Sequence, residues 1–212
     1  MIEDSYALYK SLEKKGLLKN KPFMWWPEYG SFEVVVGAIL TQNTQWTRVE
    51  VSLENLRQNN VLSLEGLCEV PIEKLQDLIK PSGLFKTKAR YLQTLALSIK
   101  EEFGSFEKFS VDVDRVWLLK SKGVGAETAD SILCYACKRN AMVVDAYTSR
   151  LLNALGYEFG SYINVQSWCI EGLKPWFKEG ELVEIYALFH GMIVEFVKKN
   201  SIGKKIDIES LR

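Results

Sequence analysis

Two glycines between two apolar-periodic segments constrain this chain more than any other feature. Gly123 and Gly125 follow a segment that ends at Leu118–Leu119, and glycine permits the positive φ angles and close backbone approaches of a tight hairpin. A second helix opens at Thr128, because apolar residues recur after it at helical spacing. Residues 118–150 therefore predict a helix, a tight turn, a second helix and a short hydrophobic run.

The turn itself is suited to an anion. Its backbone N–H groups, together with the unsatisfied donors of the following helical turn, form a concave site that fits a phosphate. A nucleic-acid backbone is a ligand of this kind, which makes Gly123, Val124, Gly125 and Thr128 candidate contact residues. Taken alone, a Gly-x-Gly before a helix more often marks a plain helix–helix turn, so the residues that follow have to decide.

An isolated acid follows the hairpin. Asp145 comes directly after the apolar run Met142–Val144, which we expect to be packed, so its carboxylate lies at the edge of a core. A carboxylate in such a place needs a partner or a chemical role. Asp145 suits the N-cap of a following helix, and a capping role is compatible with catalysis.

These motifs together resemble a known family. The pattern GVGxxTA, a helix, and VVD with Arg150 five residues after the aspartate resembles the helix-hairpin-helix glycosylases of the endonuclease III superfamily. The resemblance implies that the hairpin grips a DNA strand and that Asp145 is catalytic. Bifunctional members carry a lysine two residues after the second glycine, where this chain has Glu127. Because an amine forms a Schiff base with the sugar and a carboxylate does not, the resemblance implies a monofunctional glycosylase that uses water.

The composition is that of a globular protein. With 212 residues, 47% of them hydrophobic, the chain is long enough for a substantial core. Basic and acidic residues are equal at 27 each, so a DNA site has to come from local segregation of charge. No apolar run approaches the roughly 20 residues that cross a bilayer, and we expect no secretory leader. We expect a cytoplasmic protein with no membrane contact.

Cysteine usage argues against metal or redox chemistry. Four cysteines are scattered along the chain, which predicts reduced thiols: Cys68, Cys134, Cys137 and Cys169. The CxxC pair lacks a second cysteine pair, and the chain has one histidine, so packed cysteines are favoured over a metal or redox site. We expect no metal and no cofactor.

A polar break interrupts the apolar helix that starts at Ser31 and is expected to continue through Leu53. The break is Thr41–Gln45. The family has a comparable break, from which a side chain enters the gap left by an extruded nucleotide, so Gln42 or Asn43 is the candidate plug. An ordinary polar helix end is the alternative.

The clearest basic patch is residues 80–100, with five basic residues and no acidic one. Lysines beside a turn, Lys88 among them, suit phosphate contacts that set affinity without reading sequence, although a solvated charged face is the alternative. The family has a Gly-Leu-aromatic turn here whose leucine wedges into the base stack. Gly83 and Leu84 match it, and such wedges partly offset lost stacking.

Tryptophans supply a candidate base pocket. The cluster Phe23–Pro27 cannot form a long helix because prolines pin it, so it fills a core or lines a pocket. An alkylated purine such as 3-methyladenine carries positive charge that electron-rich rings attract. The tail adds a further clue, because Glu195 stands where the first iron–sulfur cysteine of many relatives would fall and no cysteine follows Cys169. Without thiolates there is no such cluster.

The WWP segment, LTQNT, the missing hairpin lysine and the cysteine-free tail together most resemble the 3-methyladenine DNA glycosylases of the superfamily. That resemblance implies the following pocket candidates: Trp25, Trp26, Pro27, Trp46 and Lys198. A lysine facing a cationic base is unfavourable unless it is neutralised or turned away. His190 matches the family's His-Gly pair, and a structural role is favoured over a catalytic one. The basic tail after residue 198 either touches DNA or is solvated.

The sequence thus predicts an all-α protein of two lobes, residues 31–137 with the hairpin and residues 1–30 plus 138–212, with Asp145 at the mouth of a cleft. The predicted function is excision of alkylated purines from damaged duplex DNA by a monomer. Three alternatives stay open. They are a bifunctional lyase acting on oxidised pyrimidines, a DNA-binding module without catalysis, and a mismatch-specific adenine or thymine glycosylase.

Overall fold

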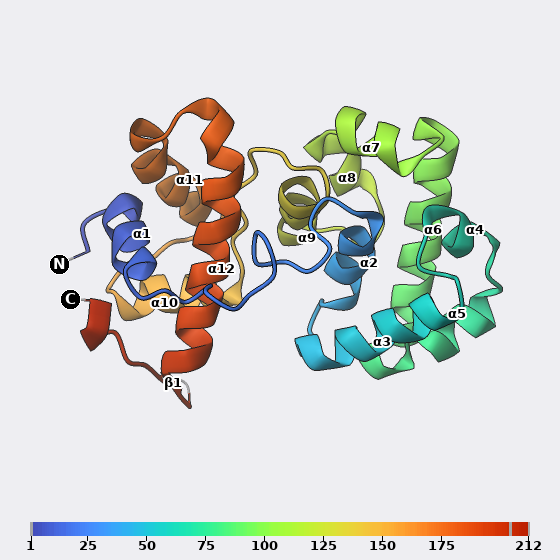
Figure 1. The fold of residues 1–212 in the computed structure, drawn as a ribbon, viewed down its shortest axis with the longest axis horizontal. Coiled ribbons are helices and arrows are strands. Elements are labelled where there is room, and N and C mark those ends of the chain that lie inside the picture. The colour runs from blue at the N-terminus through green and yellow to red at the C-terminus, as the bar shows by residue number, and fades with distance from the viewer. Residues whose placement is uncertain (1, 204, 212) are drawn as a thin grey trace. The chain divides into compact units, whose positions relative to one another are not determined.

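The computed structural model describes residues 2–203 and 205–211. Its regular structure is almost entirely helical, which confirms the predicted all-α class (Figure 1). The chain forms two compact units, Met1–Tyr29 with Arg139–Arg212 and Gly30–Lys138. We refer to them as the discontinuous unit and the continuous unit.

The continuous unit is built around its longest helix, α6, against which α2, α4, α5 and α7 pack (Figure 1). An apolar stripe on α6, including Leu92, Leu95 and Ile99, is buried, as expected for a helix that neighbours cover on several sides. The elements are α2 Phe32–Leu40, α3 Trp46–Gln58, α4 Leu64–Glu69, α5 Ile72–Leu78, η1 Lys80–Ser82, α6 Phe85–Phe103, α7 Phe106–Asp112, α8 Arg115–Lys120, α9 Ala126–Ser131 and the π-helical η2 Ile132–Ala136.

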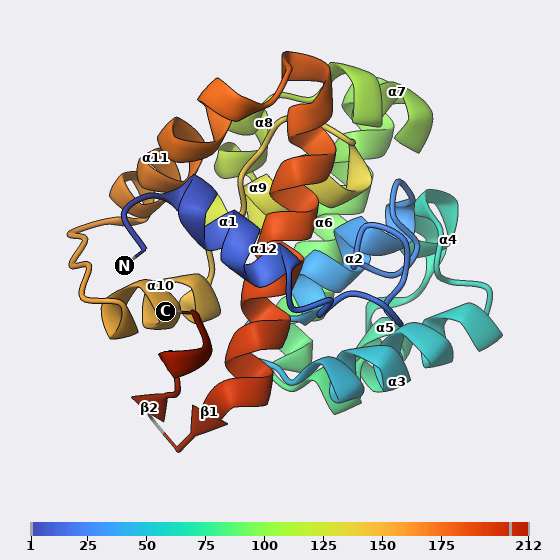
Figure 2. The ribbon, with the colours of Figure 1, turned by 60° about the vertical axis from the view of Figure 1, so that its left-hand side comes forward.

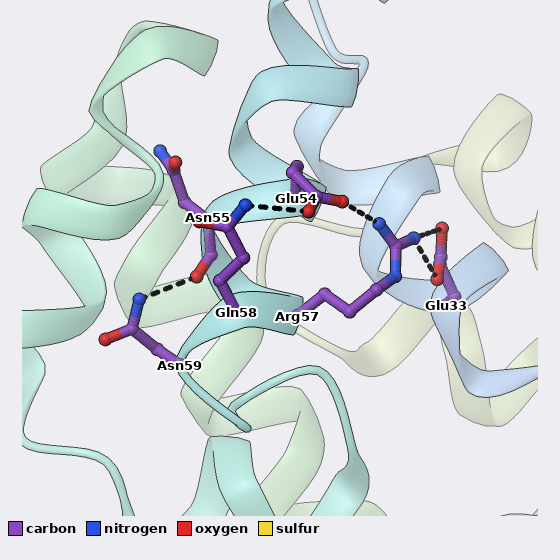
Figure 3. A network of polar contacts seen from close by, with 6 residues as sticks. All are labelled: Glu33, Glu54, Asn55, Arg57, Gln58 and Asn59. Atoms are coloured by element: carbon purple, nitrogen blue, oxygen red, sulfur yellow. Dashed lines mark hydrogen bonds and ion pairs between the residues drawn. The ribbon is translucent and has the colours of Figure 1, made fainter.

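The prediction of one helix that continues from Ser31 through Leu53 was wrong, because this segment forms two helices. α2 ends at Leu40 and α3 begins at Trp46. Asn43 between them has φ +51°, a left-handed backbone that a right-handed helix cannot contain. Across this break the guanidinium of Arg57 on α3 holds both oxygens of Glu33 on α2, each at 2.9 Å, and also pairs with Glu54 (Figure 3).

The hairpin forms where it was predicted, between α8 and α9. The second helix begins at Ala126, two residues before the expected Thr128. Gly123 adopts φ +87°, and a Cβ built there would lie 2.2 Å from the ring of Tyr91. Only glycine satisfies both conditions, since a side chain would meet backbone strain and the aromatic ring together.

The discontinuous unit packs α1 and α10 against α12, and α1 also lies beside α11 (Figure 2). Its core includes Leu8, Leu152, Cys169, Phe189 and Phe196, all fully buried. The elements are α1 Ser5–Glu13, α10 Ala146–Ala154, α11 Tyr162–Leu173, η3 Lys174–Trp176, η4 Glu179–Glu181, α12 Leu182–Asn200, β1 Ser201–Ile202, β2 Lys205–Ile206 and η5 Glu209–Leu211. β1 and β2 pair antiparallel, with Ser201 opposite Ile206. Lys204 and Arg212 of the predicted basic tail lie outside the described residues.

The cysteines are reduced, and Cys134, Cys137 and Cys169 are buried. Burial raises the pKa of the thiols of Cys134 and Cys169, so neither is poised as a thiolate. Within residues 2–203 and 205–211, no group of three or more His, Cys, Asp or Glu side chains is arranged to hold a metal ion. None of the described helices is long and apolar enough to cross a membrane.

Candidate functional site

Asp145 is the N-cap residue of α10, as one of its two predicted roles required. Its Oδ1 accepts hydrogen bonds from the backbone N of Thr148 at 2.8 Å and from the Thr148 hydroxyl at 3.0 Å. These bonds satisfy a donor of the first helical turn and fix the orientation of the carboxylate. The side chain keeps 13% of its surface exposed, so the carboxylate is held at an edge and not sealed in the interior.

The other oxygen of Asp145 faces α12. Its Oδ2 lies 3.4 Å from Nε2 of His190, whose side chain is buried. Burial by itself raises the pKa of the Asp145 carboxyl, but the contact with His190 and the two bonds from Thr148 outweigh it, so the pKa lies below its ordinary value. The carboxylate is therefore ionised at neutral pH, as stabilisation of a developing positive charge requires.

Trp25 packs on the same histidine. Its ring lies edge-on to His190 with centroids 5.2 Å apart, and Nε1 donates to Oε1 of Glu195 at 3.1 Å. Gly191 explains how the indole reaches α12, because a Cβ there would lie 2.5 Å from Trp25 Cγ. The His-Gly pair thus has two physical functions. The histidine contacts both Asp145 and Trp25, and the glycine leaves room for the indole.

The segment that carries Trp25 is strained. Met24, Trp25 and Glu28 all have positive φ angles, with Trp25 at +71°. A bulky residue in this region costs on the order of 1–3 kcal/mol and is found where the surroundings over-determine it, often at functional sites. Here the hydrogen bond to Glu195 and the packing on His190 provide that constraint.

Lys198 lies at the limit of ion-pair distance from Glu195, and its role in a base pocket stays a prediction. Its Nζ lies 4.0 Å from Glu195 and 5.7 Å from the ring centre of Tyr147. Lys21 also pairs with Glu195, at 2.6 Å. Burial raises the pKa of the Glu195 carboxyl, yet Lys21, Trp25 and Lys198 together bring it below its ordinary value. Glu195 is therefore an anion that accepts the hydrogen bond of Trp25 and lies close to two lysines, Lys21 and Lys198.

The remaining pocket candidates divide between the units. Trp26 is buried and meets Trp25 edge-on, with ring centroids 6.0 Å apart. Pro27 follows it and is half-buried. Trp46 begins α3 in the continuous unit. A pocket shared by Trp46 with the other tryptophans accordingly stays a prediction.

In the continuous unit the hairpin is linked to the polar break. Nε2 of Gln42 donates to the carbonyl of Gly123 at 2.8 Å and to the hydroxyl of Thr128 at 3.0 Å. The side chain of Val124 is buried, and its backbone N donates to the carbonyl of Ser121 at 3.0 Å within the turn. Gly125 is the N-cap of α9 in extended backbone, and Glu127 in the first turn of that helix is exposed.

Two turns of the continuous unit carry the candidate inserting residues. We call Thr41–Gln45 the asparagine turn and Lys80–Leu84 the leucine turn. Asn43 is exposed at the tip of the first. Leu84 is 68% exposed at φ +46°, directly after Gly83 at φ +65°, so an apolar side chain faces solvent from strained backbone. A depression of about 250 Å³ lies between the turns and is lined by Asn43, Thr44, Gln45, Arg48, Ser82 and Gly83.

The predicted phosphate contact of Lys88 in the basic patch was wrong. It is 2% exposed, and its ammonium donates to the carbonyls of Leu40 and Ser82 and to the hydroxyl of Thr44. No donor is left for a phosphate. Lys100 pairs with Glu65 at 3.2 Å. The exposed basic side chains of this stretch that lie near the leucine turn are Lys80, Lys86 and Arg90.

Three contributors to the site were missed from the sequence, namely Thr148, Lys21 and the role of Glu195 as acceptor for Trp25. Thr148 had a local signal, because a threonine three residues after a capping aspartate offers both N–H and hydroxyl to it. The other two depend on α12 meeting the N-terminal segment, and no local pattern encodes that contact.

Comparison with known proteins gives a consistent family. Residues 36–161 match the model of the HhH-GPD superfamily base excision DNA repair proteins. A Methanocaldococcus jannaschii protein named as a "putative DNA repair glycosylase" is 42% identical over 205 residues, covering 93% of this chain and 89% of the relative. The crystal structure of an H. pylori 3-methyladenine DNA glycosylase bound to 1,N6-ethenoadenine is similar with a TM-score of 0.89 and 39% identity, covering 94% of this chain and 99% of that one.

A trapped endonuclease III–DNA covalent intermediate shares the fold, with a TM-score of 0.74 at 20% identity over 95% of this chain and 90% of that one. The family match spans more than half of the chain and includes both the hairpin and Asp145. The chain belongs to the HhH-GPD superfamily of base excision DNA repair proteins.

Proposed function

We propose that this protein is a monofunctional DNA glycosylase that removes alkylated purines, 3-methyladenine among them, from duplex DNA. The observation that carries the proposal is the state of Asp145, an ionised, partly exposed carboxylate with one oxygen fixed by Thr148 and the other facing His190. Excision requires an extruded nucleotide and an anion beside its sugar.

The chemistry follows from charge. An alkylated purine nucleotide is cationic on the base, so when the C1′–N bond breaks, the electron pair leaves with a neutral base and the positive charge moves to the sugar. The Asp145 anion stabilises that charge. Water then adds at C1′, and its proton passes to the carboxylate. No amine is needed, which agrees with Glu127 at the position where bifunctional relatives carry lysine.

The choice of an alkylated purine rests on Trp25 and on the H. pylori relative. Nε1 of the indole is held by Glu195, and a cationic base on the electron-rich face of such a ring gains a cation–π contribution. The relative with 39% identity is a 3-methyladenine DNA glycosylase whose structure contains 1,N6-ethenoadenine. We therefore assign Trp25, Trp26, Pro27 and Trp46 to base binding.

The grip on DNA is assigned to the continuous unit. The hairpin residues Gly123–Gly125 and Thr128 would bind the phosphate backbone, since backbone N–H groups at a helix start favour anions. Leu84, exposed on strained backbone, would act as the wedge, and Gln42 or Asn43 as the plug. Insertion of Gln42 would require it to give up its two bonds to the hairpin.

The decisive experiment is a glycosylase assay on duplexes that carry an alkylated, an oxidised or a mismatched base, with wild type and Asp145→Asn side by side. We expect release of alkylated purines by wild type and a loss of about 100-fold or more in Asp145→Asn, as for removal of an electrostatic stabiliser. Thermal unfolding of both proteins controls for folding. Full activity of Asp145→Asn would refute the proposal.

The same assay separates the alternatives. Borohydride added during the reaction traps a covalent adduct if the enzyme is a lyase, and we expect none. Salt-dependent binding without release of any base would identify a DNA-binding module. Release from mismatched duplexes alone would identify a mismatch-specific glycosylase.

A further inference from the structure

Lys88 occupies a position that its charge alone does not explain. Its ammonium is buried, and it donates to Leu40 O at 2.6 Å, Thr44 Oγ1 at 2.7 Å and Ser82 O at 2.9 Å. All three acceptors are uncharged oxygens. Burying an ammonium against such partners is costly unless every donor is used, and here the three donors meet three acceptors.

The acceptors come from two segments far apart in the sequence. Leu40 ends α2, and Thr44 belongs to the asparagine turn. Ser82 belongs to the leucine turn. Lys88 itself lies in the first turn of α6, and its backbone N donates to Leu84 O at 3.0 Å. One side chain therefore ties together the asparagine turn, the leucine turn and the start of α6.

Thr44 completes the connection. Its hydroxyl accepts from Lys88 and lies 2.6 Å from Ser82 O and 3.1 Å from Gln42 O. A hydroxyl has one hydrogen to donate, so it bonds directly across to the leucine turn or back along its own turn. In either case the lysine ammonium is the common partner, and Thr44 and Ser82 also form part of the depression between the turns.

Both turns need such support, because each contains a non-glycine residue in left-handed backbone, Asn43 and Leu84. Such conformations persist only where the surroundings over-determine them. We propose that Lys88 is a positioning residue that pre-orders the two turns for insertion into the base stack, so that DNA opening does not also have to order the protein. This inference rests on the proposed function.

The test compares two DNA substrates that differ in the free energy needed to extrude the alkylated purine from the duplex. One duplex pairs the alkylated purine with thymine, and the other places it opposite an abasic-site analogue, where no base pair has to break. Single-turnover rates are measured at saturating enzyme for wild type, Lys88→Met and Thr44→Val. Methionine keeps an unbranched chain of similar size, and valine keeps the shape of threonine, so both variants preserve packing.

We expect Lys88→Met to lose about 10-fold on the paired duplex, as for loss of charge-assisted hydrogen bonds, and less than about twofold opposite the abasic analogue. Thr44→Val should show a smaller loss with the same substrate dependence. Lys86→Met is the matched control, since it removes an exposed charge two residues away, and it should affect both substrates equally.

Amide hydrogen exchange gives a second readout that needs no catalysis. The amides of Thr44, Ser82 and Gly83 donate to the carbonyls of Thr41, Ile79 and Lys80. In Lys88→Met they should exchange at least about 10-fold faster, while α4 and α5 stay unchanged. Equal losses on both substrates, no loss on either, or unchanged exchange in the turns would overturn the inference. If wild type releases no alkylated purine, the proposed function fails, and the exchange measurement alone decides whether Lys88 orders the turns.

Discussion

Replacing Gly191 with alanine tests the architecture of the site most directly. A Cβ at this position would lie 2.5 Å from Trp25 Cγ and 2.7 Å from Trp25 Cβ, whereas carbon atoms pack at about 3.5–4.0 Å. The indole therefore has to retreat from α12 by roughly 1 Å. That retreat lengthens the 3.1 Å bond from Trp25 to Glu195 and disturbs the edge contact with His190.

The free energy of unfolding should change little, because two effects oppose each other. Overpacking costs about 1–3 kcal/mol, while alanine is preferred over glycine inside a helix by about 1 kcal/mol, so the net destabilisation is about 0–2 kcal/mol. Base binding should change more, since a displaced stacking ring loses about 1–3 kcal/mol. We expect kcat/KM for 3-methyladenine release to fall about 10-fold or more.

Two measurements decide the matter. Thermal unfolding and single-turnover kinetics are compared for Gly191→Ala and for Gly180→Ala, where a Cβ meets open space and no effect is expected. Tryptophan fluorescence reports whether the indole has moved. If Gly191→Ala retains wild-type kcat/KM although the indole has moved, Trp25 does not bind the base.

Two further predictions follow from single side chains. His190→Phe keeps an aromatic ring against Trp25 but removes the nitrogen that faces Asp145, so kcat should fall about 10-fold with little change in KM, as for one hydrogen bond to a charged group. His190→Gln should recover part of that loss, and equal losses in both variants would contradict a positioning role. Burial lowers the pKa of Lys88 to about 8, against about 10.4 in an unfolded chain. The unfolded state therefore binds more protons between these values, and the free energy of unfolding of wild type should rise relative to Lys88→Met from about pH 8 to 10.4. Denaturant titrations across this range measure the difference, and parallel pH profiles would contradict it.

Local chemistry made part of the site predictable. The capping position of Asp145 and the turn at Gly123 follow from residues within a few positions of each other, and an aspartate before a helix or a glycine between two helices has few alternatives. The role of the exposed Leu84 could be predicted only from the resemblance, because a leucine in the sequence does not indicate a left-handed backbone.

Non-local contacts account for what the sequence did not predict. Lys88 reads as one of five basic residues in a solvated patch, and only the approach of the asparagine turn buries it. Likewise the need for a glycine at position 191 is evident only from the structure, in which Trp25 lies against α12. The predicted continuation of α2 was wrong because the helical spacing of apolar residues does not reveal a single residue in left-handed backbone, here Asn43.

The discontinuous unit is made of the residues that precede and follow the continuous stretch Gly30–Lys138. Trp25 is synthesised early, but its supports Gly191 and Glu195 lie on α12, as does the histidine that faces Asp145. The continuous unit, to which we assign the grip on DNA, is therefore synthesised completely before Asp145 gains its contact with His190. Under the proposed function, a nascent chain stalled before α12 would contain the proposed DNA-binding turns but not the histidine that faces Asp145, so DNA binding would be established before base excision.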